Sequence, residues 1–166
     1  MEFFIETDRL ILRKPNAKDI YGLLKILDDP KVKEFVPSFY LSTYEEVLSL
    51  LEILKLADQN DIWLVLEEKK SKKLVGVLSA YRTSENLLPI SYAVLSSRRG
   101  EGFIPEAIKG FVSFLKSHFP SVDVVFAIRR NNISSKNVIK KLHIPFDYTR
   151  EHYNYYTLSL SEELPF

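Results

Sequence analysis

The chain has 166 residues, of which 46% are hydrophobic and 27% charged, and this composition predicts one globular domain, residues 1–166, with a buried core. Its 23 basic and 22 acidic side chains give a formal charge of +1, so no overall field favours nucleic acid or an anionic membrane as a partner. Cysteine is absent, which excludes disulfides, thiolate metal sites and a cysteine nucleophile, and with three histidines we expect no metal. The N-terminal stretch mixes charged and apolar residues, unlike a secretory signal or a spanning helix, so we expect a cytoplasmic protein.

The first half of the chain predicts a strand, two helices and a hairpin, in that order. Apolar and charged residues alternate in DRLILRK, which is typical of a strand. Asn16 and Ser42 each precede an acidic residue by three positions, the pattern of a helix N-cap, and apolar residues at helical spacing follow both. IWLVLEE and LVGVLSAY predict two strands that the lysine-rich turn KKSKK joins.

The second half predicts strands that alternate with helices. PISYAVL predicts a strand, and a run with helical apolar spacing follows it. VDVVFAI is an unbroken apolar run, which favours a strand covered on both faces, as in the parallel part of a sheet. After a last helix, HYNYYTLSL predicts a closing strand, which could lie at a sheet edge and pair with a second copy in a homodimer, or could belong to the core. The expected fold class is therefore mixed α+β.

The stretch SSRRGEGFIPEAIKGF places glycines and two arginines between a strand and a helix. Glycine lets a ligand approach the backbone, and the first N–H groups of a helix have no partner within it. The helix dipole adds partial positive charge there, and Arg98 or Arg99 can neutralise a phosphate. A glycine turn with solvated arginines is the alternative, but the position between strand and helix favours an anion site. The stretch is not a Walker loop, and it lacks the third glycine of a dinucleotide fingerprint.

SYAVLSSRRGEGFIPEAIKGFVSF resembles the acyl-CoA-binding motif of the GNAT N-acetyltransferases, especially the branch with the ribosomal-protein N-terminal acetyltransferases. The matching residues are Tyr92, Arg99, Gly100, Gly102, Phe103, Glu106 and Ala107. NISSKNVIKKL resembles the family's second block through Asn132, Ser135, Val138, Ile139, Lys141 and Leu142. ETDRLILRKPNAKD and HYNYYTLS resemble the first and closing strands, so the similarity covers nearly the whole chain in order.

This resemblance implies the GNAT fold, a mostly antiparallel central sheet with helices on both faces, whose fourth and fifth strands splay apart to admit a pantetheine arm. It also implies acetyl-CoA as co-substrate. Backbone N–H groups from Arg99 to Ile104 would hold the pyrophosphate, the N–H of Val94 would meet the thioester carbonyl, and Asn132 would contact the pantetheine. The cofactor-binding residues implied are therefore Val94, Arg99, Gly100, Gly102, Phe103, Ile104 and Asn132.

The reaction that the resemblance implies is direct attack of a primary amine on acetyl-CoA in a ternary complex, the amine belonging to a protein N-terminus or a small molecule. Many members protonate the leaving thiol with a tyrosine seven residues after the motif asparagine, but this position is Ile139, so Ser135 is the candidate donor. Ser135 could equally be an N-cap or early-turn residue. Glu85 is the candidate general base, or a solvated loop acid. Tyr40 and Tyr92 are candidate substrate residues, and each could instead pack in the core.

Two departures from the family pattern concern the cofactor site. Ile104 stands where the family prefers glycine or alanine, so its branched side chain could obstruct the pyrophosphate, and Pro105, without an N–H, replaces the usual threonine. Ile104 and the unmarked general base favour an alternative: a catalytically inactive GNAT-fold module for acyl-CoA binding or interaction. A third interpretation, a nucleotide-binding protein that uses the same glycines, ranks last because the sequence has no magnesium-site signature.

Overall fold

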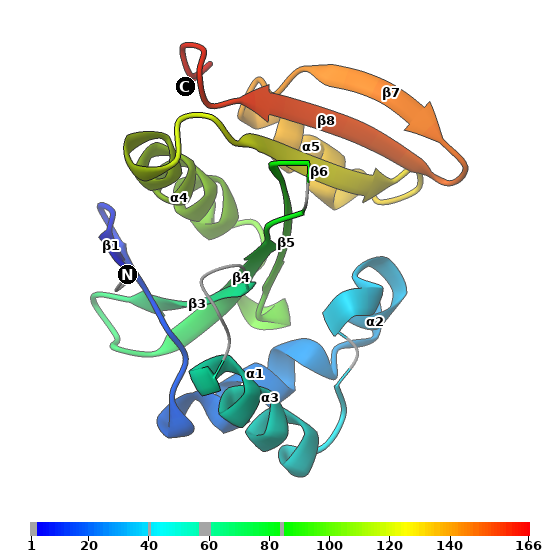
Figure 1. Cartoon of the computed structure of the whole chain (residues 1–166). Helices are drawn as coiled ribbons and strands as arrows, with labels where there is room; N and C mark the ends of the chain where they lie inside the picture. The colour runs from blue at the N-terminus through cyan, green and yellow to red at the C-terminus, as the bar shows by residue number, and fades with distance from the viewer. Residues whose placement is uncertain (1–2, 40, 57–60, 84) are drawn as a thin grey trace.

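The computed structural model describes residues 3–39, 41–56, 61–83 and 85–166 (Figure 1). Its strands are β1 (Phe4–Glu6), β2 (Leu10–Arg13), β3 (Asp61–Glu68), β4 (Leu74–Tyr81), β5 (Leu87–Val94), β6 (Asp123–Arg129), β7 (Phe146–Arg150) and β8 (Tyr153–Ser159). Its α-helices are α1 (Ile20–Leu27), α2 (Pro30–Phe35), α3 (Tyr44–Leu56), α4 (Phe103–His118) and α5 (Ile133–Lys141), with 3-10 turns η1 (Ala17–Asp19), η2 (Pro37–Phe39) and η3 (Ser96–Arg98). Within the described residues the strands form one sheet in the order β1-β2-β3-β4-β5-β6-β8-β7, antiparallel throughout except between β5 and β6.

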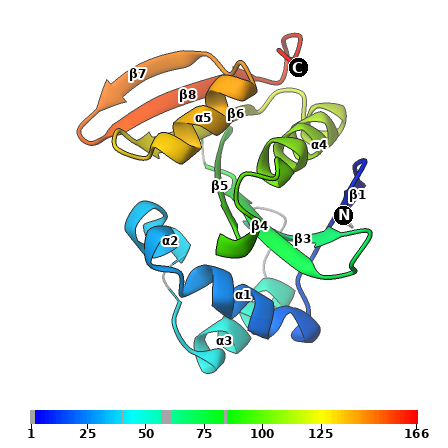
Figure 2. The ribbon, with the colours of Figure 1, turned by 180° about the vertical axis from the view of Figure 1, so that it is seen from behind.

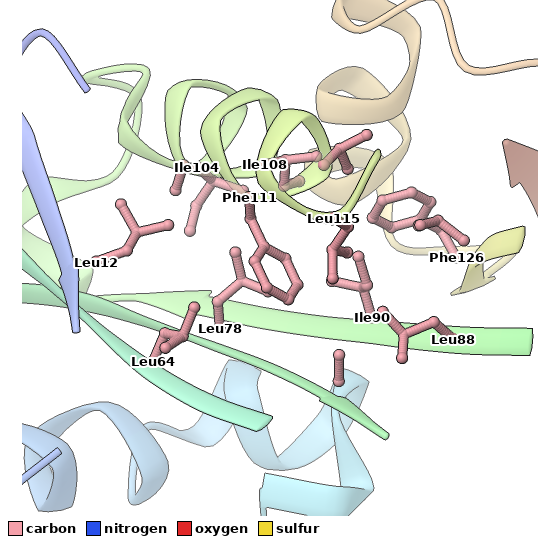
Figure 3. Packing of buried hydrophobic residues seen from close by; sticks show 14 of the residues in the cluster. Leu12, Leu64, Leu78, Leu88, Ile90, Ile104, Ile108, Phe111, Leu115 and Phe126 are labelled. Atoms are coloured by element: carbon pink, nitrogen blue, oxygen red, sulfur yellow. The ribbon is translucent and has the colours of Figure 1, made fainter. Parts of the chain in front are cut away.

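Helices cover both faces of the first half of this sheet (Figures 1 and 2). On one face, α4 buries Ile108 and Phe111 against strand residues such as Leu78, as Figure 3 shows. On the other face, α1, α2 and α3 enclose Val65 and Val77. Because successive side chains of a strand point to opposite faces, a strand between two helical layers buries both sets. The mixed fold with helices on both faces is thereby confirmed.

The second half of the sheet is different, because β6 buries alternate residues only. Val124 and Phe126 face α4 and α5 in the core, whereas Ala127 is exposed. The expectation that VDVVFAI is covered on both faces is therefore wrong. β6 is parallel to β5 only from Leu87↔Asp123 to Pro89↔Val125, and it pairs with β8 in the antiparallel sense along its whole length.

The closing strand β8 lies inside the sheet, between β6 and β7. The suggestion that HYNYY forms a sheet edge is therefore wrong, and the edge belongs to β7, which the sequence did not predict. All residues of β7 are exposed, and its alternation of Phe146 and Tyr148 with Asp147 and Thr149 is too short to stand out in the sequence. Tyr148 of this strand stacks on Tyr155 of β8, with ring centroids 4.6 Å apart.

The two predicted N-caps have different outcomes. Asn16 forms the expected capping box with Asp19, ahead of η1 and α1. Before α3, however, the box is formed by Thr43 and Glu46, one residue later than the predicted Ser42 and Glu45: the Thr43 N–H donates to the Glu46 carboxylate at 2.9 Å, and the Glu46 N–H to the Thr43 hydroxyl at 3.2 Å. Both pairs have the required spacing, so the pattern alone could not select one.

β5 and β6 begin side by side and then separate (Figure 1). Their pairing ends at Pro89 and Val125, although β5 continues to Val94 and β6 to Arg129. They are the fourth and fifth strands predicted from the sequence, because the short β1 was not foreseen, so the expected splay is confirmed. Among the helices of the described residues, none combines the length and the apolar character that crossing a membrane requires.

Candidate active site

One edge of β5 carries backbone groups that β6 no longer pairs. In an antiparallel ladder, successive residues direct their N–H groups alternately toward the partner strand and away from it. The N–H of Leu95, directly after β5, donates to the carbonyl of Val75 in β4 at 2.9 Å. By alternation, the N–H groups of Tyr92 and Val94 point to the opposite edge, where the strands have separated. The N–H of Val94 can therefore meet a carbonyl oxygen at this edge.

The glycine loop, residues 96–102, joins β5 to α4. Gly100 and Gly102 have φ values of 83° and 80°, a region that residues with a side chain rarely adopt. Gly102 is the N-cap residue of α4. Within the part of the chain that the structure describes, the N–H groups of residues 99–102 donate to no protein acceptor. Unused donors at the positive end of a sixteen-residue helix form an anion-binding surface.

The two arginines of the glycine loop already have carboxylate partners. Arg98 forms ion pairs with Glu68 at 2.9 Å and with Glu101 at 2.8 Å, and its hydrogen bond lowers the pKa of Glu68 to about 2. Arg99 pairs with Asp29 at 2.8 Å. The expectation that one of these side chains neutralises a phosphate therefore does not match their arrangement here. The glycine loop can therefore bind an anion through its backbone N–H groups and not through an unpaired arginine.

Asp29 connects the glycine loop to α2. Its carboxylate accepts hydrogen bonds from the N–H groups of Lys31 and Val32 as the N-cap of α2, and it also binds Arg99. Burial alone would raise the pKa of Asp29, but the hydrogen bonds from Arg99 and the helix N-terminus outweigh it and lower the pKa. The sequence carried no signal for this link, because its two ends are 70 residues apart.

Glu106, which the resemblance matched without a role, ties the first turn of α4 to the N-terminal strands. It accepts hydrogen bonds from the Thr7 hydroxyl at 2.6 Å and from the Arg9 N–H at 2.8 Å, and it forms an ion pair with the Arg9 side chain at 2.6 Å. These bonds outweigh burial and lower the pKa of Glu106. The TDR segment ahead of β2 thus holds the base of the glycine loop.

Ile104 and Phe103 point away from the outer surface of the glycine loop. Both side chains are buried in the core beneath α4, and Figure 3 shows Ile104 on the helix face that meets the sheet. The branched side chain therefore does not occupy the surface where the unused N–H groups lie, which removes the reason to expect that it obstructs a pyrophosphate. Pro105 lies in the first turn of α4, where its missing N–H costs no helical hydrogen bond.

Asn132, Ser135 and Tyr92 lie together on the α4 and α5 side of the opening between β5 and β6. Asn132 is the N-cap of α5, and its side-chain oxygen accepts the Ser135 N–H at 3.1 Å. Ser135 is therefore an early-turn residue and not the N-cap. The Tyr92 hydroxyl reaches from β5 to the carbonyl of Ser135 at a long 3.5 Å, and its ring meets the Phe126 ring edge-on. Burial raises the pKa of Tyr92, so its hydroxyl remains protonated.

Glu85 does not join this group. It is exposed in the turn before β5, at the end of the sheet where β5 and β6 are still paired. Leu87, the first residue of β5, is already five strand residues, about 16 Å, from Tyr92. Tyr40 lies outside the described residues. Its neighbour Phe39 is fully buried and packs against Trp63, with ring centroids 4.9 Å apart.

A basic cavity of about 720 Å³ lies where β6 ends and the turn between β7 and β8 approaches the start of α5. Its lining consists of Arg129, Arg130, Asn131, Lys136, His152, Tyr153 and Asn154. Sequence reasoning missed it, although the run RRNN directly after a strand was an available signal. In the described ranges, no group of three or more histidine and carboxylate side chains could hold a metal ion.

Comparison with known proteins places this geometry in context. The family model described as "Acetyltransferase (GNAT) domain" matches residues 9–144. An acetyltransferase of the GNAT family from Bacillus anthracis superposes with a TM-score of 0.83 at 18% identity, covering 96% of this chain and 100% of that one. RimL, a ribosomal-protein alpha-N-acetyltransferase in complex with coenzyme A, gives 0.82 at 16% identity, with 95% and 98% covered. The self-immunity acetyltransferase MccE, in complex with acetyl-CoA and AMP, gives 0.75 at 16% identity, with 92% and 93% covered. No curated protein sequence matches the chain.

Proposed function

The chain belongs to the GNAT acetyltransferase family, and from that premise we propose that it transfers an acetyl group from acetyl-CoA to a primary amine on a protein N-terminus or a small molecule. The observation that carries this proposal is the glycine loop. Two positive-φ glycines expose unused N–H groups at the end of a strand that has separated from its neighbour. The complexes of RimL with coenzyme A and of MccE with acetyl-CoA support the choice of co-substrate.

The glycine loop fits the diphosphate of coenzyme A. A hydrogen bond to a charged group contributes about 1.5–3 kcal/mol, so several N–H donors can hold a diphosphate without a free arginine. Lys141 adds charge, because its Nζ lies 4.0 Å from where a Cβ on Gly102 would be. Asn132, at the opening, contacts the pantetheine arm through its amide. Acetyl-CoA supplies the acetyl group in an activated form, as a thioester.

Val94 and Ser135 take the two polar roles of acyl transfer. The N–H of Val94, at the unpaired edge of β5, stabilises the negative charge that develops on the thioester oxygen. The Ser135 hydroxyl, in the first turn of α5, donates its proton to the sulfur as the carbon–sulfur bond breaks, and it regains a proton from the ammonium group that forms when the amine attacks. The Tyr92 hydroxyl stays protonated and spans from β5 to α5, so it positions Ser135 instead of acting as a base.

The position of Glu85 favours an acceptor that needs little help to lose its proton. An α-amino group has a pKa of about 7.7–8.0, whereas a lysine-type amine has about 10.4. A substantial fraction of an α-amino group is therefore neutral near pH 7.5 and can attack without a strong base. Because Glu85 lies at the paired end of β5, we expect α-amino acceptors to react faster than lysine-type amines.

Titration calorimetry with acetyl-CoA tests the proposal, with desulfo-CoA and ATP as comparison ligands. We expect saturable binding of acetyl-CoA and desulfo-CoA and no binding of ATP. Thiol release from acetyl-CoA is then followed with a panel of N-terminal peptides and lysine-type amines. Absence of acetyl-CoA binding would refute the proposal. Binding without thiol release for any amine would leave the acyl-CoA-binding module as the correct description.

A further inference from the structure

The basic cavity is not used by the function proposed above, and its charge is uncompensated. Arg129, Arg130 and Lys136 line it together with His152, and its lining contains no carboxylate. Among the described residues, none of these four side chains forms an ion pair, whereas Arg98 pairs with two carboxylates. Like charges held close together repel one another, and a bound anion relieves that repulsion. The cavity is therefore suited to a carboxylate or phosphate.

The walls of the basic cavity are held in place by contacts that leave its charges available. Nε of Arg129 donates to the Tyr153 hydroxyl at 3.3 Å, and its guanidinium lies 5.8 Å from the centre of the same ring. The N–H of Arg130 donates to the carbonyl of His152 at 2.9 Å, which fastens the turn between β7 and β8 to the end of β6. The volume, about 720 Å³, falls within the usual range for small-ligand sites.

The basic cavity and the glycine loop lie at opposite ends of α5. Lys136, near the start of the helix, lines the cavity, whereas Lys141 at its end approaches Gly102. Because a helix of nine residues is about 13 Å long, the two places are well separated. The diverging strands lead to them, β5 to the glycine loop and β6 to the basic cavity. A diphosphate held by the glycine loop therefore leaves the cavity free for a different anionic group.

The reacting atoms of the proposed transfer lie between these two places. Ser135 directly precedes Lys136, and Asn132 directly follows Asn131 of the cavity lining. Because consecutive Cα atoms are about 3.8 Å apart, the cavity begins within about 10 Å of Ser135. An extended peptide spans about 3.3–3.6 Å per residue, so the second and third side chains of an N-terminal peptide can reach it.

The geometry points to an acceptor that carries a carboxylate or phosphate close to its reacting amine, with this anionic group bound in the basic cavity. The inference rests on the proposed function, since it names the class of acceptor for the same transfer. A peptide with acidic residues after its first position is the form that the spacing fits, and a small amine that bears a phosphate has the same chemistry.

Direct binding of labelled peptides tests this inference without relying on turnover. Three hexapeptides begin with alanine and differ only in carrying Glu, Gln or Lys at positions two and three, and fluorescence anisotropy is measured in the presence of coenzyme A. We expect the Glu peptide to bind at least 10-fold more tightly than the Gln peptide, and the Lys peptide more weakly than both. Competition by O-phosphorylethanolamine shows whether a small phosphate-bearing amine uses the same cavity.

The double variant Arg130→Ala/Lys136→Ala should weaken binding of the Glu peptide at least 10-fold and leave the Gln peptide unchanged. Both side chains are at least partly exposed, and thermal unfolding verifies that the variant folds. Lys140→Ala, an exposed lysine on the same helix, is the matched control and should change neither affinity.

Two results would overturn the inference. One is equal binding of the Glu and Gln peptides by the native chain. The other is a loss of acetyl-CoA affinity in the double variant with peptide binding unchanged, which would assign the cavity to the cofactor. Failure of the proposed function gives a different result from both. In that case the acidic peptide would still bind, but calorimetry would detect no acetyl-CoA binding, or no amine would release thiol from acetyl-CoA.

Discussion

The glycine loop and the basic cavity are both suited to anions, but the chain builds them in different ways. In the glycine loop, Arg98 and Arg99 are paired with carboxylates of the chain, and the unused donors belong to the backbone. In the basic cavity, Arg130 and Lys136 line the wall and form no ion pair within the described residues. The proposed cofactor site therefore depends on backbone geometry and the helix dipole, and the proposed acceptor site on net side-chain charge. Substitutions should affect the two places accordingly.

The largest effect should come from Ser135, which lies between the glycine loop and the basic cavity. We expect Ser135→Ala to lower kcat about 100-fold, because the leaving thiolate loses its proton donor. Acetyl-CoA affinity and acceptor KM should stay unchanged, since neither anion site is altered. Steady-state kinetics with thiol detection measures both quantities, and the exposed neighbour Ser134→Ala is the control. An unchanged kcat would contradict a role for Ser135 as proton donor and leave it a structural residue of α5.

The backbone character of the glycine loop can be tested by Gly102→Ala. With φ at 80°, a side chain at this position costs about 1–2 kcal/mol and displaces N–H donors, so acetyl-CoA should bind about 30-fold more weakly. Gly22, in α1, has no positive φ, and a Cβ there would lie at an ordinary 3.4 Å from Leu74. The control variant Gly22→Ala should therefore bind acetyl-CoA as the native chain does. Calorimetry compares the two variants, and equal affinities would contradict a backbone-based site.

Glu106→Gln tests how the base of the glycine loop is held. We expect a loss of about 2 kcal/mol in the free energy of unfolding at pH 7, because charged hydrogen bonds to Thr7 and Arg9 are weakened. The pKa of Glu106 is lowered in the folded protein, so its contribution is complete above the unfolded value of about 4.3 and is lost as the pH falls through the folded pKa.

Urea unfolding at pH 7, 5 and 3.5 should therefore show a difference between native chain and variant that is constant at the two higher values and smaller at the lowest. A difference that does not depend on pH would mean that shape, and not charge, explains the effect of Glu106→Gln.

The smallest effect is expected from Glu68→Gln, which makes the glycine loop resemble the basic cavity. Removing one carboxylate partner leaves Arg98 less neutralised, so acetyl-CoA should bind about 3-fold more tightly at low salt. Screening should remove the gain at about 1 M salt. Glu52→Gln, which breaks the exposed pair with Lys55, is the control and should have no effect. A salt-independent gain would contradict an electrostatic cause.

Sequence reasoning was most successful where the signal was local. The glycine spacing placed the loop between β5 and α4, and the apolar residues Val138, Ile139 and Leu142 indicated the helix that the structure shows as α5. It failed where two local patterns were equivalent, as with Ser42 and Thr43, and where burial depends on what covers a strand, as with β6. Glu85 was chosen by its position in the chain, and the topology places it at the end of β5 that is paired with β6.

Most strands and helices, the glycine turn and the order of the two motif blocks could be predicted from the sequence, because each depends on residues that are neighbours in the chain; β1, α2 and β7 could not. Only the tertiary structure decided which charges are free. Arg98 forms an ion pair with Glu68, 30 residues away, whereas Arg129, Arg130 and Lys136 of the basic cavity have no carboxylate partner among the described residues. Net charge at a site depends on partners that folding brings together, and no local pattern records those partners.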